Sequence, residues 1–295
     1  MQELKAMTRT DIRELKKLFS GKVRDIYEVE NDQWLIVTTD RLSAFDVVFA
    51  EGIPDKGRVL NRISNRWFSK ITSIDNHLIS TTPQNELPFL AAYEGIAERS
   101  VLVKKLKRIP MECVVRGYLF GSVYEEYKKS GTAGGVKLPS GISLAGELPE
   151  PVFTPSTKAE KGHDENINHE RFMNEVGKEL GEKIMKASTH IFTTAREIME
   201  KYGIILADTK FEFGLDEDGN LVLVDEVLTP DSSRYWELTT YRVGESPASY
   251  DKQFVRDYLD GTKWNKQPPA PALPYDVILK TREKYLQILD VIEKI

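Results

Sequence analysis

Hydrophobic and polar residues follow two different periods along this chain, and together they predict a protein of mixed strands and helices. Runs that alternate every second residue predict strands, and Asn31-Asp32 between the first two runs favours a tight hairpin turn. Runs with an apolar residue at every third or fourth position predict helices with one buried face. Strands are expected at 23–29, 34–38, 101–105 and 112–115, a hairpin at 204–228, and helices at 1–19, 57–71, 169–202 (as two helices), 247–260 and 276–295.

Residues 130–157 interrupt these patterns. The stretch is rich in Gly, Pro and Ser, so we expect a long loop or lid there. Strands gather near the N-terminus and in the later hairpin, whereas helices lie between and after them. This order predicts an α+β or mixed α/β fold with a β-rich N-terminal part, and 295 residues suffice for two domains or one large one.

The composition narrows the class of protein. Hydrophobic residues make up 40% of the chain, enough for a sizeable core, and 41 Lys and Arg against 46 Asp and Glu leave a net charge of −5. This mild acidic balance argues against a nucleic-acid-binding protein but allows a local basic pocket for small anions. The single cysteine, Cys113, and the lack of a signal-like or membrane-spanning apolar run predict a cytoplasmic protein without a membrane partner.

The long predicted hairpin carries the most specific chemistry. If Asp218-Gly219 forms a two-residue turn, Glu212 lies directly opposite Asp225. Two opposed carboxylates destabilise a strand pair unless a divalent cation lies between them, and Mg²⁺ bound in this way usually keeps phosphate oxygens as further ligands. Asp208 and Lys210 share the face of Glu212 by the two-residue period, so Lys210 could hold a phosphate or a carboxylate. A solvated polar face, with the register shifted by one residue, is the alternative.

Further cations occur at three other places. Lys22 and Arg24 follow a glycine and suit a phosphate tail, although exposed strand cations are an equally good explanation. Arg116 precedes Ser122 at a predicted helix start, where backbone N–H groups can bind phosphate, and Arg234 follows the hairpin. Weaker polar candidates in nearby loops are Ser43, Asp46, Lys158, His163, Asp231 and Ser233. Several basic positions and one acidic pair suggest ATP plus a second phosphorylated substrate.

Six segments, in the same order along the chain, resemble blocks of the phosphoribosylaminoimidazole-succinocarboxamide synthase (SAICAR synthetase) family. LADTKFEFG at 206–214 matches one family signature fully. IPMECVVRGYLFGS at 109–122 matches the other except at Phe120, where a small residue is usual. The remaining blocks are GKVRDIYEV, DRLSAFD, KAEKGHDENI and VDEVLTPDSSRYW, and the RGY and GTAGG stretches resemble the longer, yeast-like branch.

The resemblance implies an ATP-grasp-like α+β fold. A small β-rich lobe at 1–105 and a larger α/β lobe at 106–295 are expected to hold ATP between them. The implied reaction joins L-aspartate to the carboxylate of CAIR (carboxyaminoimidazole ribotide) in purine biosynthesis, and converts ATP to ADP and phosphate through an acyl phosphate. ATP, CAIR and L-aspartate are the expected partners and Mg²⁺ the expected cofactor; no nucleic acid and no obligate protein partner is expected.

The resemblance also implies roles by motif position. ATP is expected at Lys22, Arg24 and Glu212, and Mg²⁺ at Glu212 and Asp225. Lys210 is expected to bridge the reacting carboxylate and phosphate, with Asp208 as its catalytic neighbour. The CAIR phosphate is expected at Arg116, Ser122 and Arg234, and further substrate contacts at Ser43, Asp46, Lys158, His163, Asp231 and Ser233.

Three other classes of protein stay open at this point. A different ATP-dependent carboxylate–amine ligase would not need the ribotide-phosphate residues. A catalytically dead nucleotide sensor should have lost part of the acidic pair or Lys210, and all are present. A structural module would leave the pair of Glu212 and Asp225 unexplained.

Overall fold

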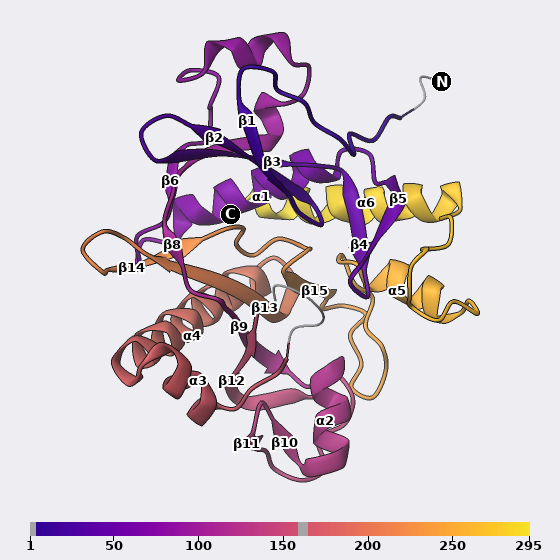
Figure 1. The fold of residues 1–295 in the computed structure, drawn as a ribbon. Coiled ribbons are helices and arrows are strands. Elements are labelled where there is room, and N and C mark those ends of the chain that lie inside the picture. The colour runs from indigo at the N-terminus through magenta and orange to yellow at the C-terminus, as the bar shows by residue number, and fades with distance from the viewer. Residues whose placement is uncertain (1–3, 159–164) are drawn as a thin grey trace.

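The computed structural model describes residues 4–158 and 165–295, and two β-sheets organise this part of the chain (Figure 1). The N-terminal sheet has five strands in the order β1-β2-β3-β7-β6, each antiparallel to its neighbours. Its strands are β1 (Lys16–Ser20), β2 (Arg24–Val29), β3 (Gln33–Thr38), β6 (Leu78–Ser80) and β7 (Ser100–Lys104). A separate pair follows β3, namely β4 (Arg41–Ala44) and β5 (Val47–Gly52).

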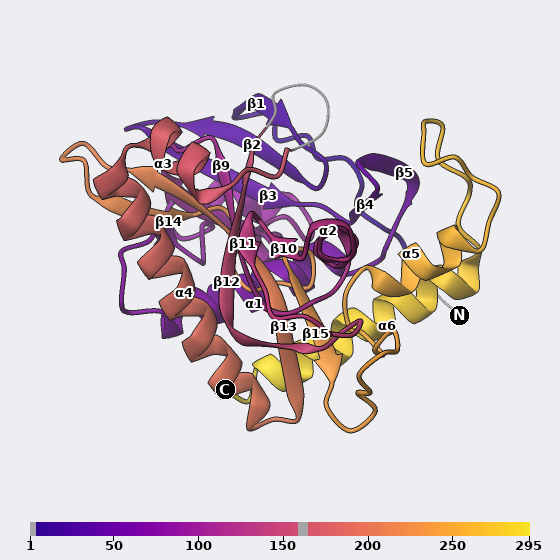
Figure 2. The ribbon, with the colours of Figure 1, turned by 90° about the horizontal axis from the view of Figure 1, so that it is seen from below.

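The second sheet is built around one long strand, β13, which pairs with β9, β14, β15 and β8, while β12 pairs with β9 at the edge. Helix α4 packs across β9, β12 and β13, and Figure 2 shows it running along this sheet. The strands are β8 (Lys107–Arg108), β9 (Met111–Tyr118), β12 (Glu147–Thr157), β13 (Ile204–Leu215), β14 (Leu221–Val224) and β15 (Ser233–Glu237), with β10 (Thr132–Ala133) and β11 (Val136–Lys137) as a small hairpin.

The helices close the largest hydrophobic core around the second sheet. In this core α1 and α6 pack against each other, and Trp67, Tyr285 and Phe192 are among its fully buried side chains. Phe211 and Phe213 of β13 point into it as the alternation predicts, which turns the intervening residues of β13 to the other face. The helices are α1 (Lys56–Lys70), α2 (Ser122–Ser130), α3 (His169–Val176), α4 (Lys178–Glu200), α5 (Gln253–Asp260) and α6 (Tyr275–Ile292), with short 3₁₀ turns at Pro88–Ala92 and Ala97–Arg99. None of the described helices is long and apolar enough to cross a membrane.

Most predicted elements are confirmed. Strands β2 and β3 form the first hairpin, and both Asn31 (φ 59°) and Asp32 (φ 54°) adopt the left-handed conformation that its turn requires. Strands β7 and β9, helices α1, α3, α4 and α6, and the hairpin of β13 and β14 lie where the hydrophobic pattern predicts them.

Three predicted elements are wrong, and tertiary pairing explains each. Residues 4–15 form no helix, and β1 takes Lys16–Ser20 because it pairs with β2. The expected loop at 130–157 ends in the eleven-residue strand β12. Its prolines are tolerated because β12 is an edge strand, where a missing N–H breaks no ladder bond. The helix expected at 247–260 begins at Gln253, since Ser249 bridges to Trp236 of β15 and holds the preceding backbone extended.

Candidate functional site

The charged face of β13 forms the centre of the site. Glu212 is only 2% exposed, yet it is surrounded by cations: it contacts Lys158, and its carboxylate oxygens lie 3.2 Å from Lys210 Nζ and 3.5 Å from an Arg108 nitrogen. Burial alone would raise the pKa of Glu212, but Lys210 and Lys158 together hold it well below its ordinary value. We call Lys210, Glu212, Glu112, Lys158 and Arg108 the central cluster.

Lys210 is held on its other side by Glu112, whose Oε1 lies 2.5 Å from Lys210 Nζ. Burial would lower the pKa of Lys210, but Glu212 and Glu112 raise it above its ordinary value, so the ammonium stays charged. Glu112 was not among the predicted site residues. The two-residue period that places Glu112 on the same face of β9 as Arg116 could have indicated it.

The register of the long hairpin corrects one prediction. Glu212 pairs with Val224, and the loop 216–220 replaces the expected two-residue turn. The reason is Asp216, whose side chain accepts hydrogen bonds from the backbone of Asp218 (3.0 Å) and Asn220 (2.7 Å) and stabilises the longer loop. Glu212 and Asp225 are therefore not directly opposed.

Asp225 instead faces the N-terminal sheet. It lies just beyond β14 with a φ of 68°, and Arg24 of β2 contacts both its carboxylate and that of Glu226, the latter at 3.0 Å. Burial opposes the charge on Arg24, but Asp225, Glu226 and, further away, Glu212 raise its pKa above the ordinary value. One guanidinium thus links the two sheets beside the central cluster.

Lys22 lies apart from Arg24. It precedes β2, and its Nζ lies 2.5 Å from an oxygen of Asp46, which sits at the β4–β5 turn with a φ of 62°. The two cations therefore contact different carboxylates, although both lie at the same end of β2.

His77 is a buried residue near this link, and no sequence motif marks it. It packs against Phe68 (ring centroids 5.5 Å apart) and lies close to Asp225. Burial lowers the pKa of His77 to about 4, so the imidazole beside Asp225 is neutral near pH 7.

A second group of charges lies further along β13, around Asp208. One oxygen of Asp208 lies 2.6 Å from Arg234 Nη1 and 3.3 Å from Arg116 Nη1. Helix α2 begins beside them at Ser122, after Gly121 with a φ of 68°. A Cβ atom on Gly121 would lie 3.0 Å from Arg234 Nη2, so this nitrogen is directed toward the helix N-terminus. We call these five residues the anion pocket.

The remaining predicted residues have varied surroundings. Lys158 belongs to the central cluster, whereas Ser233 is buried with its Oγ 2.7 Å from Thr209 Oγ1. Ser43 is buried on β4. His163 lies outside the described residues. Asp231 is enclosed by Lys56 Nζ (2.8 Å), Lys252 Nζ (2.8 Å) and the hydroxyl of Tyr285 (2.6 Å).

The side chains that could bind a divalent cation are few in the described part of the chain. Within the described residues no three or more His, Cys, Asp or Glu side chains gather as a metal site. Among the same residues, however, Oε2 of Glu212 is buried without a hydrogen bond. This free oxygen of Glu212 is the observation compatible with Mg²⁺, an ion that usually takes its further oxygens from water and phosphate.

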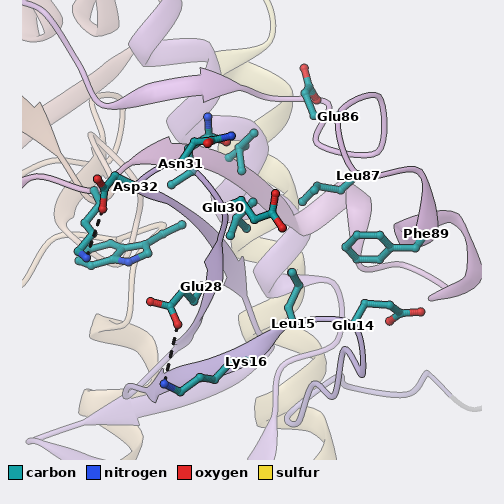
Figure 3. A pocket seen from close by; sticks show the side chains of 15 residues that line it. Glu14, Leu15, Lys16, Glu28, Glu30, Asn31, Asp32, Glu86, Leu87 and Phe89 are labelled. Atoms are coloured by element: carbon teal, nitrogen blue, oxygen red, sulfur yellow. Dashed lines mark ion pairs between the residues drawn. The ribbon is translucent and has the colours of Figure 1, made fainter.

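Two cavities clarify where an anionic ligand fits. A small one, about 20 Å³, lies beside Arg24 and Asp225 and has a lining of mixed polarity, which includes Ile36, Leu78 and Asn61. A cavity of about 760 Å³ lies at the other end of the β2–β3 hairpin (Figure 3). Its lining includes Glu14, Glu28, Glu30, Asp32 and Glu86 against Lys16 and Lys105, so it disfavours phosphates, and it contains none of the predicted site residues.

The fold is of the mixed α/β class, with buried clusters of charged side chains along β13, and the comparisons with known proteins show that the chain is an enzyme. The SAICAR synthetase family profile matches residues 17–271. A phosphoribosylaminoimidazole-succinocarboxamide synthase from Thermodesulfovibrio yellowstonii is 53% identical over 285 residues, 96% of this chain and 97% of the relative.

Solved structures agree with the sequence relatives. SAICAR synthase from Saccharomyces cerevisiae, complexed with SAICAR, is 41% identical with a TM-score of 0.88 and 98% coverage of both chains. A SAICAR synthetase in complex with ADP is 25% identical, with a TM-score of 0.68 and coverage of 94% of this chain and 97% of that one. The chain belongs to the SAICAR synthetase family, the ATP-dependent ligases of purine biosynthesis that join L-aspartate to CAIR.

Proposed function

We propose that this chain joins L-aspartate to the carboxylate of CAIR with ATP, through an acyl-phosphate intermediate. The observation that carries the proposal is the arrangement of β13, which has the anion pocket at Asp208 and the central cluster at Lys210 and Glu212. At ~3.4 Å per residue along a strand, a ribotide phosphate in the pocket leaves the rest of CAIR extending toward Lys210.

We assign the nucleotide to the region between the two sheets, in an ATP-grasp-like arrangement of a lobe at 1–105 and a lobe at 106–295. Arg24 and Lys22 supply cations for the phosphates. ADP in one relative and SAICAR in another support a nucleotide site and a ribotide site in this chain.

Glu212 and Asp225 would hold Mg²⁺, which when bound neutralises phosphate charge during phosphoryl transfer. Lys210 keeps its proton and draws the CAIR carboxylate and the γ-phosphate together as a fixed positive charge. A carboxylate oxygen of CAIR attacks the γ-phosphorus and ADP leaves. The amine of L-aspartate then attacks the acyl carbon, the phosphate leaves, and the amine loses a proton to give the amide.

The test is ADP release measured with CAIR, with and without L-aspartate. We expect continuous ADP release only when both are present. CAIR labelled with ¹⁸O in its carboxylate should deliver one labelled oxygen to inorganic phosphate. Absence of CAIR- and aspartate-dependent ADP would refute the reaction, and unlabelled phosphate would refute the acyl phosphate.

A different carboxylate–amine ligase is the second candidate. The anion pocket argues against it, because two arginines and a helix N-terminus form a site for a phosphate group. Ligation of L-aspartate to a carboxylic acid without a phosphate, at a rate similar to that with CAIR, would favour this second candidate.

A further inference from the structure

Phe120 lies beside the anion pocket without belonging to it. It occupies the turn between β9 and α2, directly before Gly121, and is 6% exposed. Its ring centroid lies 5.5 Å from the guanidinium carbon of Arg234. The same ring meets Trp236 edge-on, with centroids 5.3 Å apart and planes at 75°. Phe120 is therefore wedged between a buried aromatic residue and a cation of the pocket.

Arg234 needs such a contact because few of its nitrogens are anchored. Its Nη1 donates to Asp208 at 2.6 Å, whereas its Nε is buried with no hydrogen-bond partner among the described residues. A guanidinium held at one nitrogen can still rotate about that bond. An aromatic ring at this distance attracts the cation through its quadrupole, and burial strengthens the attraction.

We propose that Phe120 is a positioning residue, whose ring holds the Arg234 guanidinium with Nη2 directed at the N-terminus of α2. The contact prepares the pocket for a phosphate monoester before the ligand arrives. Phe120 is also the position at which 109–122 departs from the family signature that the segment resembles. The identity of the ligand, the ribotide phosphate of CAIR, rests on the proposed function.

Two substitutions distinguish the effect of the aromatic ring on Arg234 from the effect of apolar packing alone. Phe120→Leu keeps an apolar contact with Trp236 but removes the ring, whereas Phe120→Tyr keeps the ring. We expect the KM for CAIR to rise about three- to tenfold in Phe120→Leu, because a partly buried cation–π contact is lost. The KM for ATP and the kcat at saturating CAIR should stay within about twofold of the parent, and Phe120→Tyr should restore the KM for CAIR.

The matched control is Phe89→Leu, which removes a ring from the acidic cavity of Figure 3, remote from Arg234. Its KM for CAIR should equal that of the parent. If Phe120→Leu does not fold, Phe120→Met serves in its place. An unchanged KM for CAIR in the folded Leu or Met variant would overturn the proposal, as would a failure of Phe120→Tyr to restore it.

Binding of ribose 5-phosphate, measured by calorimetry, separates this inference from the proposed function. A parent that binds this probe more tightly than Phe120→Leu supports the inference even if CAIR is not turned over. Equal affinity in the parent and Phe120→Leu overturns the inference even if the ligase activity is found.

Discussion

The central cluster balances its buried charges residue by residue. Lys210 lies between the carboxylates of Glu112 and Glu212, and both raise its pKa above the ordinary value despite burial. Such a lysine is a permanent positive charge and not a general base. This agrees with a role in phosphoryl transfer, in which charge neutralisation and positioning dominate.

Asp225 provides a direct test at the residue scale. Asp225→Asn keeps the size of the side chain but removes the negative charge that pairs with Arg24 and is proposed to hold Mg²⁺. We expect ADP release to fall at least about a hundredfold, because electrostatic stabilisation of the transferred phosphoryl group is lost.

The control for this substitution is Asp218→Asn in the exposed loop of the same hairpin, where turnover should be unchanged. Both variants are assayed for ADP release over a range of Mg²⁺ concentrations. Near-normal turnover of Asp225→Asn at ordinary Mg²⁺ would contradict the metal assignment.

At the scale of elements, the anion pocket depends on how α2 begins. Gly121 has a φ of 68° and a ψ of −141°, a conformation that side chains with a Cβ strongly disfavour. Its missing Cβ also leaves the space that Arg234 Nη2 approaches. One glycine therefore sets both the helix start and the position of the arginine.

Gly121→Ala should affect stability and substrate binding together. We expect the free energy of unfolding to fall by about 1–3 kcal/mol from backbone strain. The KM for CAIR should rise about tenfold or more, since Arg234 is displaced from the phosphate. Urea unfolding and steady-state kinetics measure the two effects.

Gly131→Ala, at the other end of α2, is the matched control. Gly131 has a φ of 72° but no atom within 4 Å of the position of its absent Cβ. We expect a loss of about 1 kcal/mol from the backbone alone and an unchanged KM for CAIR. Equal effects of both substitutions on the KM would show that the pocket does not depend on this contact.

Elements that bury one face are predicted well from sequence, because burial of that face directly sets the spacing of hydrophobic residues along the chain. Phe211 and Phe213 identify the inner face of β13, and hence the charged outer face. The register of a strand pair is predicted poorly. The side chain of Asp216 sets the length of the loop between β13 and β14, and the pairing partner of Glu212 is therefore Val224 and not Asp225. Strand β12 was missed because its prolines are acceptable only at a sheet edge, which is a property of the assembled sheet.

At the scale of the whole molecule, Asp231 connects distant parts of the chain. Its carboxylate binds Lys56 at the start of α1, Lys252 before α5 and Tyr285 of α6. The isolated sequence offered Asp231 only as a loop residue, because nothing local indicates partners that lie far along the chain. For the same reason, the gathering of Arg116 and Arg234 around Asp208 could be expected only from the resemblance.

Asp231→Asn should destabilise the protein in a pH-dependent way. At neutral pH the variant leaves two buried ammonium groups without their carboxylate, and we expect the free energy of unfolding to fall by about 3–5 kcal/mol. Burial opposes the charge on Asp231, but Lys252 and Lys56 hold its folded-state pKa well below the ordinary value.

The sign of the pH effect follows from the lowered pKa. The unfolded chain takes up a proton at Asp231 near its ordinary pKa of about 3.9, before the folded chain does, so the stabilisation is complete above that pH and lost as pH falls. The difference in Tm between parent and variant should be constant from about pH 7 to 5 and shrink below about 4.5. Asp276→Asn, which removes an exposed ion pair on α6, should change the free energy of unfolding by less than about 0.5 kcal/mol. If the difference in Tm between the parent and Asp231→Asn increased as the pH was lowered, this account would be contradicted.

The separation of the anion pocket from the central cluster has a consequence for product release. On the proposed function, the pocket holds the phosphate ester, which is identical in CAIR and SAICAR. Binding energy from that end is therefore the same for substrate, transition state and product, and it lowers KM without accelerating the chemical step. If Arg116 and Arg234 bind the phosphate of CAIR more tightly, they also bind the phosphate of SAICAR more tightly. SAICAR should therefore compete with CAIR for the free enzyme. Only the central cluster, at the other end of β13, can therefore distinguish the two ribotides. The group expected there is a carboxylate in CAIR and an amide in SAICAR.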